Sequence, residues 1–181
     1  HGGFNVPLSQ GLVQLYTGNG KGKTTAAMGL AFRGAGAGLS AVIVQFMKGQ
    51  HYSELDSVHN SRLPIKIEQY GSPEFCRPEA DDIDMHRDLA AKGLARAQEI
   101  VNSNGCDILV LDEICTALLF TLITLDDIIS LIKNKPASME LVLTGRGAPE
   151  DLYPFCDLIT EMKEIKHYYT QGIQARVGIE Y

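Results

Sequence analysis

Strand-like and helix-like segments alternate along the chain, and this alternation predicts a sheet of parallel strands covered by helices. The strand-like segments are residues 12–17, 41–46, 65–70, 106–111, 140–144 and 157–162. Apolar residues at helical spacing predict helices over residues 23–35 and 83–104. Thr124 can cap a further helix, and Pro149 suits the first turn of another. The expected fold class is therefore α/β, a three-layer and mostly parallel open sheet.

Differences between the strand patterns predict where each strand lies. The run at 41–46 is continuously apolar, which is typical of a central strand buried on both faces. Residues 65–70 alternate with period two, which favours a place nearer an edge, and 157–162 is expected to be the last core strand. A long polar segment, 71–84, is expected to be either a functional lid or disordered.

Composition narrows the class of protein. A chain of 181 residues with 45% hydrophobic and 21% charged residues fits one globular domain. We expect this domain at 12–181, with 1–11 as an N-terminal extension or tag remnant. The net charge of -6 argues against nucleic-acid or anionic-membrane partners, and no apolar run approaches the ~20 residues of a membrane span. Four scattered cysteines favour reduced thiols in a cytoplasmic protein.

The segment Thr17-Gly-Asn-Gly-Lys-Gly-Lys-Thr-Thr25 carries the strongest chemical signal. It joins a strand to a helix, and three glycines let its backbone N–H groups surround an anion at the helix N-terminus. Lys23 adds a cation for phosphate oxygens, and Thr24 offers a hydroxyl to Mg²⁺. Thr17 stands where the usual pattern has Gly. The segment predicts a P-loop that binds a nucleoside triphosphate, against the alternative of a plain Gly-rich turn.

A second part of the site is predicted at Asp112 and Glu113, which end an apolar strand. In P-loop proteins an acid at this position holds Mg²⁺ opposite the loop Thr. Adjacent residues of an extended strand point to opposite faces, so both acids cannot share one role unless the strand has already turned. The alternative is a pair of solvated acids at a strand end.

Four basic residues are weaker candidates. Arg146 follows a strand and can stabilise charge on a leaving polyphosphate, or be a surface residue of a Gly-flanked turn. Lys48 follows another strand and can meet phosphate or a carboxylate. Arg33 and His167 can equally be solvated or structural. Pattern alone does not choose among an ATPase, a kinase and other phosphate chemistry.

Several motifs together resemble the ATP:corrinoid adenosyltransferases. They are the P-loop, Val44-Gln-Phe-Met-Lys-Gly49, Val110-Leu-Asp-Glu113, Leu143-Thr-Gly-Arg146, Lys166-His167 and the closing segment 172–181. The resemblance covers about residues 12 to 181. It implies a RecA-like sheet, a homodimer and transfer of the 5′-deoxyadenosyl group of ATP to a Co(I) corrinoid, releasing triphosphate. Adenosylcobalamin biosynthesis or salvage is the implied setting, with a flavoprotein as a candidate reductant.

The resemblance also implies roles for individual residues. Catalytic roles fall to Lys23, Glu113 and Arg146, and Mg²⁺ would bind Thr24 and Glu113. The residues expected to contact the nucleotide are Gly18, Asn19, Gly20, Lys21, Gly22, Lys23, Thr24, Thr25, Arg33, Arg146 and His167. The corrinoid would contact Tyr70 and Phe75. In some members a Phe and a Trp displace the lower axial ligand of the corrinoid, whereas this chain has no Trp.

Two alternatives stay open on the residues alone. One is a RecA-like ATPase or small-molecule kinase, for which Glu113 could position a water molecule. The other is a binding module in which ATP orders the 71–84 segment. The phosphate product discriminates, because triphosphate indicates adenosyl transfer and ADP indicates phosphoryl transfer or hydrolysis.

Overall fold

The sheet has six strands, all parallel, in the order β3-β2-β4-β5-β1-β6. The computed structural model describes residues 8–74, 76 and 82–181. Its strands are β1 (Val13–Thr17), β2 (Ala41–Phe46), β3 (Ile65–Tyr70), β4 (Ile108–Asp112), β5 (Glu140–Thr144) and β6 (Leu158–Glu161). The prediction of a mostly parallel sheet is confirmed.

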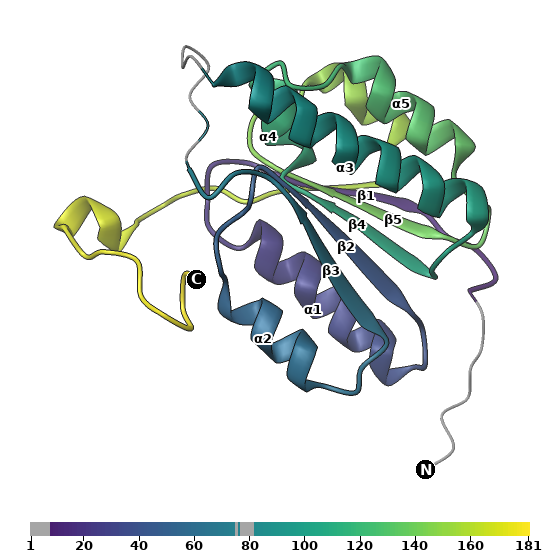
Figure 1. Cartoon of the computed structure of the whole chain (residues 1–181), viewed down its shortest axis with the longest axis horizontal. Coiled ribbons are helices and arrows are strands. Elements are labelled where there is room, and N and C mark those ends of the chain that lie inside the picture. The colour runs from purple at the N-terminus through teal and green to yellow at the C-terminus, as the bar shows by residue number, and fades with distance from the viewer. Residues whose placement is uncertain (1–7, 75, 77–81) are drawn as a thin grey trace.

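Helices cover both faces of the sheet, as Figure 1 shows. The helices are α1 (Lys23–Gly36), α2 (Ser53–Asn60), α3 (Ile83–Ser103), α4 (Ile114–Leu119) and α5 (Leu125–Asn134), with 3₁₀ turns η1 (Glu150–Phe155) and η2 (Tyr168–Gln171). α1 and α2 lie on one face, and α3, α4 and α5 lie on the other. The three-layer α/β architecture is confirmed. Among the described helices, none combines the length and the apolar character that a bilayer crossing requires.

The central strands form the core. Every residue of β2 and β4 is buried, as expected for parallel strands covered on both faces. A larger apolar cluster packs between the sheet and α3, α4 and α5, and a smaller one packs between the sheet and α1. At roughly 25 cal/mol per Å² of buried apolar surface, these two layers supply the main driving force for folding.

Most predicted elements are present, but the last strand lies at an edge of the sheet and not in its core. β3 is an edge strand, as its alternating pattern predicted. The prediction of a core strand at the end of the chain is wrong, because β6 is the other edge strand and all its residues are exposed. Leu158 and Ile159 make its sequence look buried, but the element that follows β6 in the described part of the chain is the short η2, which buries none of its residues. Thr124 caps α5 in a capping box with Asp127, as its position predicted.

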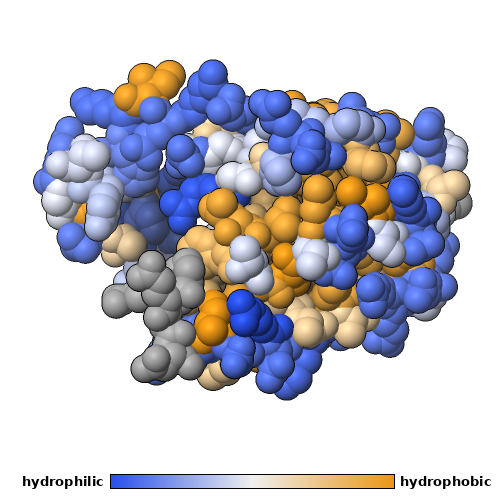
Figure 2. Space-filling model, turned by 90° about the horizontal axis from the view of Figure 1, so that it is seen from above, coloured by the Kyte–Doolittle hydropathy of each residue, from blue (hydrophilic) through white to orange (hydrophobic). Residues whose placement is uncertain are grey.

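The face of α3 and α4 exposes hydrophobic side chains. Figure 2 shows hydrophobic side chains gathered near the middle of this face. Met85 of α3 and Leu119 of α4 are among the large exposed hydrophobic residues. A contiguous apolar surface of this kind is typical of a binding surface.

The loops that follow β1, β2, β4 and β5 meet at one edge of the sheet, because parallel strands place all their carboxyl ends on the same side. This edge carries the P-loop segment, Lys48, the two acids and Arg146. Only part of the predicted 71–84 loop lies within the described residues.

Candidate active site

The loop between β1 and α1 has the backbone conformation of an anion-binding loop. Gly18 and Gly22 have positive φ angles of 96° and 122°, which favour glycine. A Cβ atom on Gly18 would lie 2.4 Å from the carbonyl oxygen of Met162, so this position also requires glycine for space. Gly22 is the N-cap of α1 and brings no side chain to it, which leaves first-turn N–H groups for a ligand or water.

Thr17, the departure from the usual pattern, has a structural role. Its hydroxyl accepts a hydrogen bond from the N–H of Ala148 at 3.4 Å, and its carbonyl accepts one from the N–H of Met162 at 2.8 Å. Thr17 is buried and joins the end of β1 to the segments after β5 and β6. It therefore leaves the anion-binding part of the loop unchanged.

Lys23 is held over this loop. Its ammonium donates to the carbonyl oxygens of Gly18 at 2.7 Å and Gly20 at 2.8 Å. Burial lowers the pKa of Lys23 below its ordinary value, although the negative charge of Glu113 opposes that effect. A lysine in this position presents a positive charge where the loop N–H groups converge.

Asp112 is the centre of the hydrogen-bond network at this edge. Its side chain is completely buried, and four side chains donate to its two oxygens. The donors are Thr24 Oγ1 (2.8 Å), Thr144 Oγ1 (2.7 Å), Lys48 Nζ (2.8 Å) and Gln45 Nε2 (3.3 Å). The Thr24 hydroxyl donates its hydrogen bond to this carboxylate and accepts one from Lys48 Nζ at 3.2 Å, which leaves one of its two lone pairs for a cation.

Glu113 follows at the point where the strand has turned. Its φ of 62° is left-handed, a conformation that non-glycine residues adopt mostly at functional or strained sites. Its N–H donates to Thr144 Oγ1 at 2.9 Å, and its Oε2 accepts from Thr116 Oγ1 at 2.5 Å. The turn lets both acids serve one site, which an extended strand would prevent.

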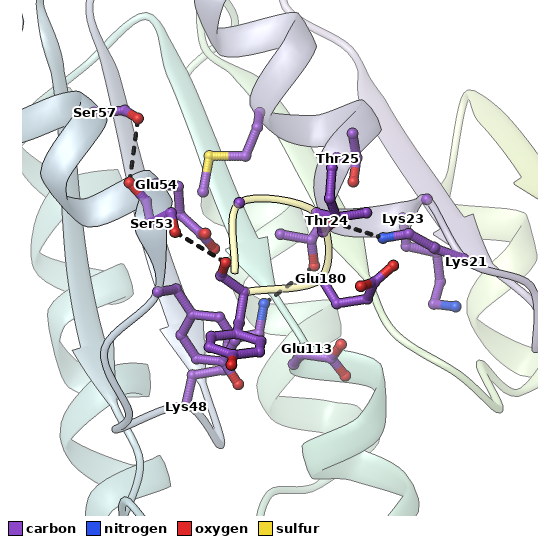
Figure 3. A pocket seen from close by; sticks show the side chains of 16 residues that line it. Lys21, Lys23, Thr24, Thr25, Lys48, Ser53, Glu54, Ser57, Glu113 and Glu180 are labelled. Carbon is purple, nitrogen blue, oxygen red and sulfur yellow. Dashed lines mark hydrogen bonds between the residues drawn. The ribbon is translucent and has the colours of Figure 1, made fainter. Parts of the chain in front are cut away.

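A cavity of about 520 Å³ lies beside the P-loop. Figure 3 shows its walls, which come from residues 21–25, Lys48, the start of α2, Glu113 and residues 178–181. This volume is in the range of pockets that hold ligands of nucleotide size. The cavity is therefore the candidate site for the nucleotide.

The closing segment of the chain forms one wall of this cavity. Lys21 Nζ donates to the carbonyl oxygen of Ile179 at 3.3 Å, and Ser53 Oγ donates to that of Tyr181 at 2.9 Å. Glu180 holds the segment together by accepting hydrogen bonds from Arg176 and from Tyr168. Those hydrogen bonds, Arg176's first, lower the pKa of Glu180 to about 2. The sequence did not predict that residues 178–181 line the cavity, because the family resemblance was the only signal in this segment.

Comparison with known proteins shows the family of the chain. Residues 9–181 match the family model described as "ATP:corrinoid adenosyltransferase BtuR/CobO/CobP". The chain belongs to this family. Proteins named corrinoid adenosyltransferase are similar to it over 95% of its length: one from Sinorhizobium is 34% identical, with 81% of that relative covered, and one from Pseudomonas aeruginosa is 32% identical, with 84% covered. One from Escherichia coli is 27% identical, with 86% covered.

Within this family member, the structure brings only some of the predicted nucleotide contacts to the cavity. Lys21, Gly22, Lys23, Thr24 and Thr25 line it. Gly18 and Gly20 shape the loop, and Asn19 is an exposed residue at its tip.

Three predicted residues lie away from the cavity wall. Arg33 is in the last turn of α1, about 15 Å along the helix from Lys23 at 1.5 Å per residue. Arg146 is exposed on the loop after β5, and its charge is felt at Lys23. His167 is the N-cap of η2, where its Nδ1 accepts from the N–H of Tyr169 at 3.0 Å. For His167 the structure shows a capping contact.

Of the two predicted corrinoid contacts, Tyr70 lies on the α3 side of the sheet. Tyr70 ends β3 and packs against Gly93 of α3, where an added Cβ would approach the Tyr70 ring at 3.2 Å. Its hydroxyl donates to Glu68 Oε2 at 3.1 Å. Phe75 lies outside the described residues.

The cysteines do not offer a nucleophile to this site. All four are free. Burial raises the pKa of Cys115 to about 12 and that of Cys106 to about 11. Such thiols stay protonated near neutral pH and behave as inert packing residues.

The donors at this edge fit a magnesium ion. Mg²⁺ prefers oxygen ligands and commonly uses one or two carboxylates together with substrate phosphates. Thr24 and Glu113 line the cavity, and buried Asp112 lies directly behind Thr24. Our prediction assigns the ion to Thr24 and Glu113, and the structure adds a hydrogen bond from the Thr24 hydroxyl to Asp112.

Proposed function

We propose that the cavity beside the P-loop binds Mg²⁺-ATP and that the chain transfers the 5′-deoxyadenosyl group of this ATP to the cobalt of a reduced corrinoid. The activity is that of the family to which the chain belongs. The observation that supports it best is the Thr24–Asp112 hydrogen bond beside the Lys23 loop, which joins the two halves of a phosphate and metal site.

The reaction depends on the relative positions of the two substrates more than on proton transfer by the protein. Co(I) of the substrate is the nucleophile, and its electron pair forms the cobalt–C5′ bond. The C5′–O bond breaks, and its electron pair leaves with triphosphate. The protein must hold C5′ in line with cobalt and stabilise the charge that develops on the leaving group.

We assign the phosphates to the loop N–H groups and Lys23, and the magnesium ion to Thr24 and Glu113. Magnesium, when bound, supplies positive charge to the polyphosphate. Asp112 accepts a hydrogen bond from the Thr24 hydroxyl and thereby fixes the direction of the hydroxyl lone pairs. Arg146 is proposed to add positive charge from the loop after β5, and Asn19 and Lys21 to contact the nucleoside side.

The corrinoid is proposed to bind on the other side of the carboxyl edge, toward Tyr70 and the exposed hydrophobic face of α3 and α4. Phe75, outside the described residues, is kept as a second proposed contact. Tyr70 packs on the α3 side of β3, whereas the P-loop leads into α1 on the opposite face. Apolar surface favours a large and partly apolar macrocycle. Asp112 ends the central strand β4 at this edge, and we propose that the reacting atoms meet near it.

We also propose a homodimer and an external reductant, for which a flavoprotein is the candidate class. The exposed edge strand β6 supports a second copy, because Leu158 and Ile159 are both open to solvent there. A reductant is required because the attacking cobalt must reach the Co(I) state. Sedimentation velocity tests the dimer.

The deciding experiment is an anaerobic assay with Mg²⁺-ATP and chemically reduced corrinoid. We expect a photolabile cobalt–carbon product and one triphosphate for each corrinoid, and we expect Lys23→Ala to abolish both. ADP as the phosphate product, with no adenosylated corrinoid, would instead favour the ATPase or kinase alternative.

A further inference from the structure

The Lys48 ammonium contacts two side chains of the proposed phosphate and metal site, Asp112 and Thr24. It donates to Asp112 Oδ2 at 2.8 Å and to Thr24 Oγ1 at 3.2 Å. Thr24 in turn donates its proton to Asp112 Oδ1 at 2.8 Å. The ammonium therefore uses one of the two lone pairs of the Thr24 hydroxyl, the oxygen that a cation at this site would also contact.

The backbone around Lys48 is built for this position. Met47 has a left-handed φ of 59°, so the chain turns sharply where β2 ends. A Cβ on Gly49 would lie 2.2 Å from the carbonyl oxygen of Gly71, and a Cβ on Gly71 would lie 2.3 Å from the backbone N of Lys48. Because the backbone is fixed by these close approaches, the mobile part is the four-carbon side chain of Lys48.

Charge explains why the lysine is there. Asp112 has no exposed side-chain surface, and a buried carboxylate without a cation is costly. Among the described residues, Lys48 is the cation that forms an ion pair with it. Burial by itself lowers the pKa of Lys48, but the charge and hydrogen bond of Asp112 outweigh this effect and raise the pKa.

We propose that Lys48 is an internal counter-ion of Asp112 that competes with the divalent metal for the Thr24 hydroxyl and for the negative charge of Asp112. Without metal, its ammonium neutralises Asp112. When Mg²⁺-ATP is bound, the ammonium leaves this pair for the polyphosphate and adds to the positive charge around the leaving triphosphate. The inference rests on the proposed Mg²⁺-ATP site and assigns Lys48 a role in binding the polyphosphate there.

The cavity offers the ammonium a place to move. Lys48 lines it together with Thr24 and Glu113. Its Nζ lies 5.3 Å from the centre of the Tyr52 ring, on the cavity wall. A rotation of its terminal torsions therefore carries the charge within the cavity, without a change in the pinned backbone.

The test uses Lys48→Met and Mn²⁺ alone, followed by electron paramagnetic resonance without nucleotide or corrinoid. We expect the variant to bind Mn²⁺ about tenfold more tightly than the natural chain, because the competing cation is gone. In EDTA the variant should melt at a lower temperature than the natural chain, and added Mg²⁺ should recover part of that loss. Lys48→Gln, which keeps a hydrogen-bond donor without charge, should show the same gain in Mn²⁺ affinity.

Two further variants make the result specific. Lys66→Met removes a lysine paired with Glu68, far from the P-loop, and should leave Mn²⁺ binding unchanged. Lys48→Met combined with Asp112→Asn should recover metal-free stability relative to Lys48→Met alone, and should lose the gain in Mn²⁺ affinity. Unchanged or weaker Mn²⁺ binding in both Lys48→Met and Lys48→Gln would overturn the inference.

These results are separable from the adenosyl-transfer assay, because neither the Mn²⁺ titration nor the melting curve involves corrinoid. Adenosyl transfer by the natural chain with unchanged Mn²⁺ binding in the Lys48 variants would overturn the counter-ion and leave the function intact. Tighter Mn²⁺ binding without adenosyl transfer would support the counter-ion and reject the function.

Discussion

At the scale of single residues, Glu68 is the clearest link between charge and stability. Arg96 of α3 donates to both of its oxygens, at 2.9 and 3.1 Å, and Tyr70 donates as well, at 3.1 Å. The hydrogen bond from Arg96 is the largest cause that lowers the pKa of Glu68 to about 2. Because the folded-state pKa is depressed, the stabilisation is present above the ordinary pKa and is lost as pH falls toward 2.

Arg96→Met should therefore remove a pH-dependent contribution. We expect the free energy of unfolding to fall by about 1 kcal/mol near neutral pH, with a smaller difference from the natural chain at about pH 3. Urea unfolding at both pH values measures this. Arg87→Met, which breaks an exposed pair with Asp84 on the same helix, is the control and should change neither value. Equal losses at the two pH values for Arg96→Met would contradict the prediction.

Residue chemistry at the site was only partly predictable from sequence. The P-loop is a local motif, and the structure has its glycine conformations and its lysine as predicted. The hydrogen bond from Thr24 to Asp112 and the left-handed turn at Glu113 were not predictable, because no local pattern announces either of them. The role of Lys48 was left open between phosphate and carboxylate, because its partner Asp112 lies on another strand.

At the scale of elements, buried strands were predictable and isolated surface elements were not. β2 and β3 have the predicted bounds because their patterns are strong. α2 was missed because it buries none of its residues and therefore shows no apolar face. β6 looked like core although it is an exposed edge, because strand patterns do not reveal which faces are covered.

The closing segment is the element whose place depends most on contacts between distant residues. Its hydrogen bond to Ser53 joins residues 128 positions apart, which no local signal encodes. Glu180→Ala should release the segment from Arg176 and Tyr168, and we expect the KM for ATP to rise by roughly fivefold with a smaller change in kcat. Steady-state kinetics measure this, with Glu164→Ala, at an exposed acid outside the cavity wall, as the control. An unchanged KM for ATP in Glu180→Ala would count against a wall role for the segment.

At the scale of the whole molecule, the cavity is where three separate parts of the chain meet. The P-loop, the start of α2 and residues 178–181 all contribute walls. A ligand that contacts all three walls binds only the native state, because the walls come together only there. Binding should therefore stabilise the whole fold and reduce opening of its weakest parts together.

Mg²⁺-ATP without corrinoid provides the test. At a concentration about 100 times its dissociation constant, a ligand adds about 2.7 kcal/mol, which for a chain of this size raises Tm by roughly 5 to 10 °C. Scanning calorimetry measures the shift, and EDTA should remove most of it. Amide hydrogen exchange should slow in the P-loop, at the start of α2 and in residues 178–181, with little change in α5, which lies on the opposite face of the sheet from α1 and α2. Protection confined to the P-loop would show that the other two walls do not contact the nucleotide.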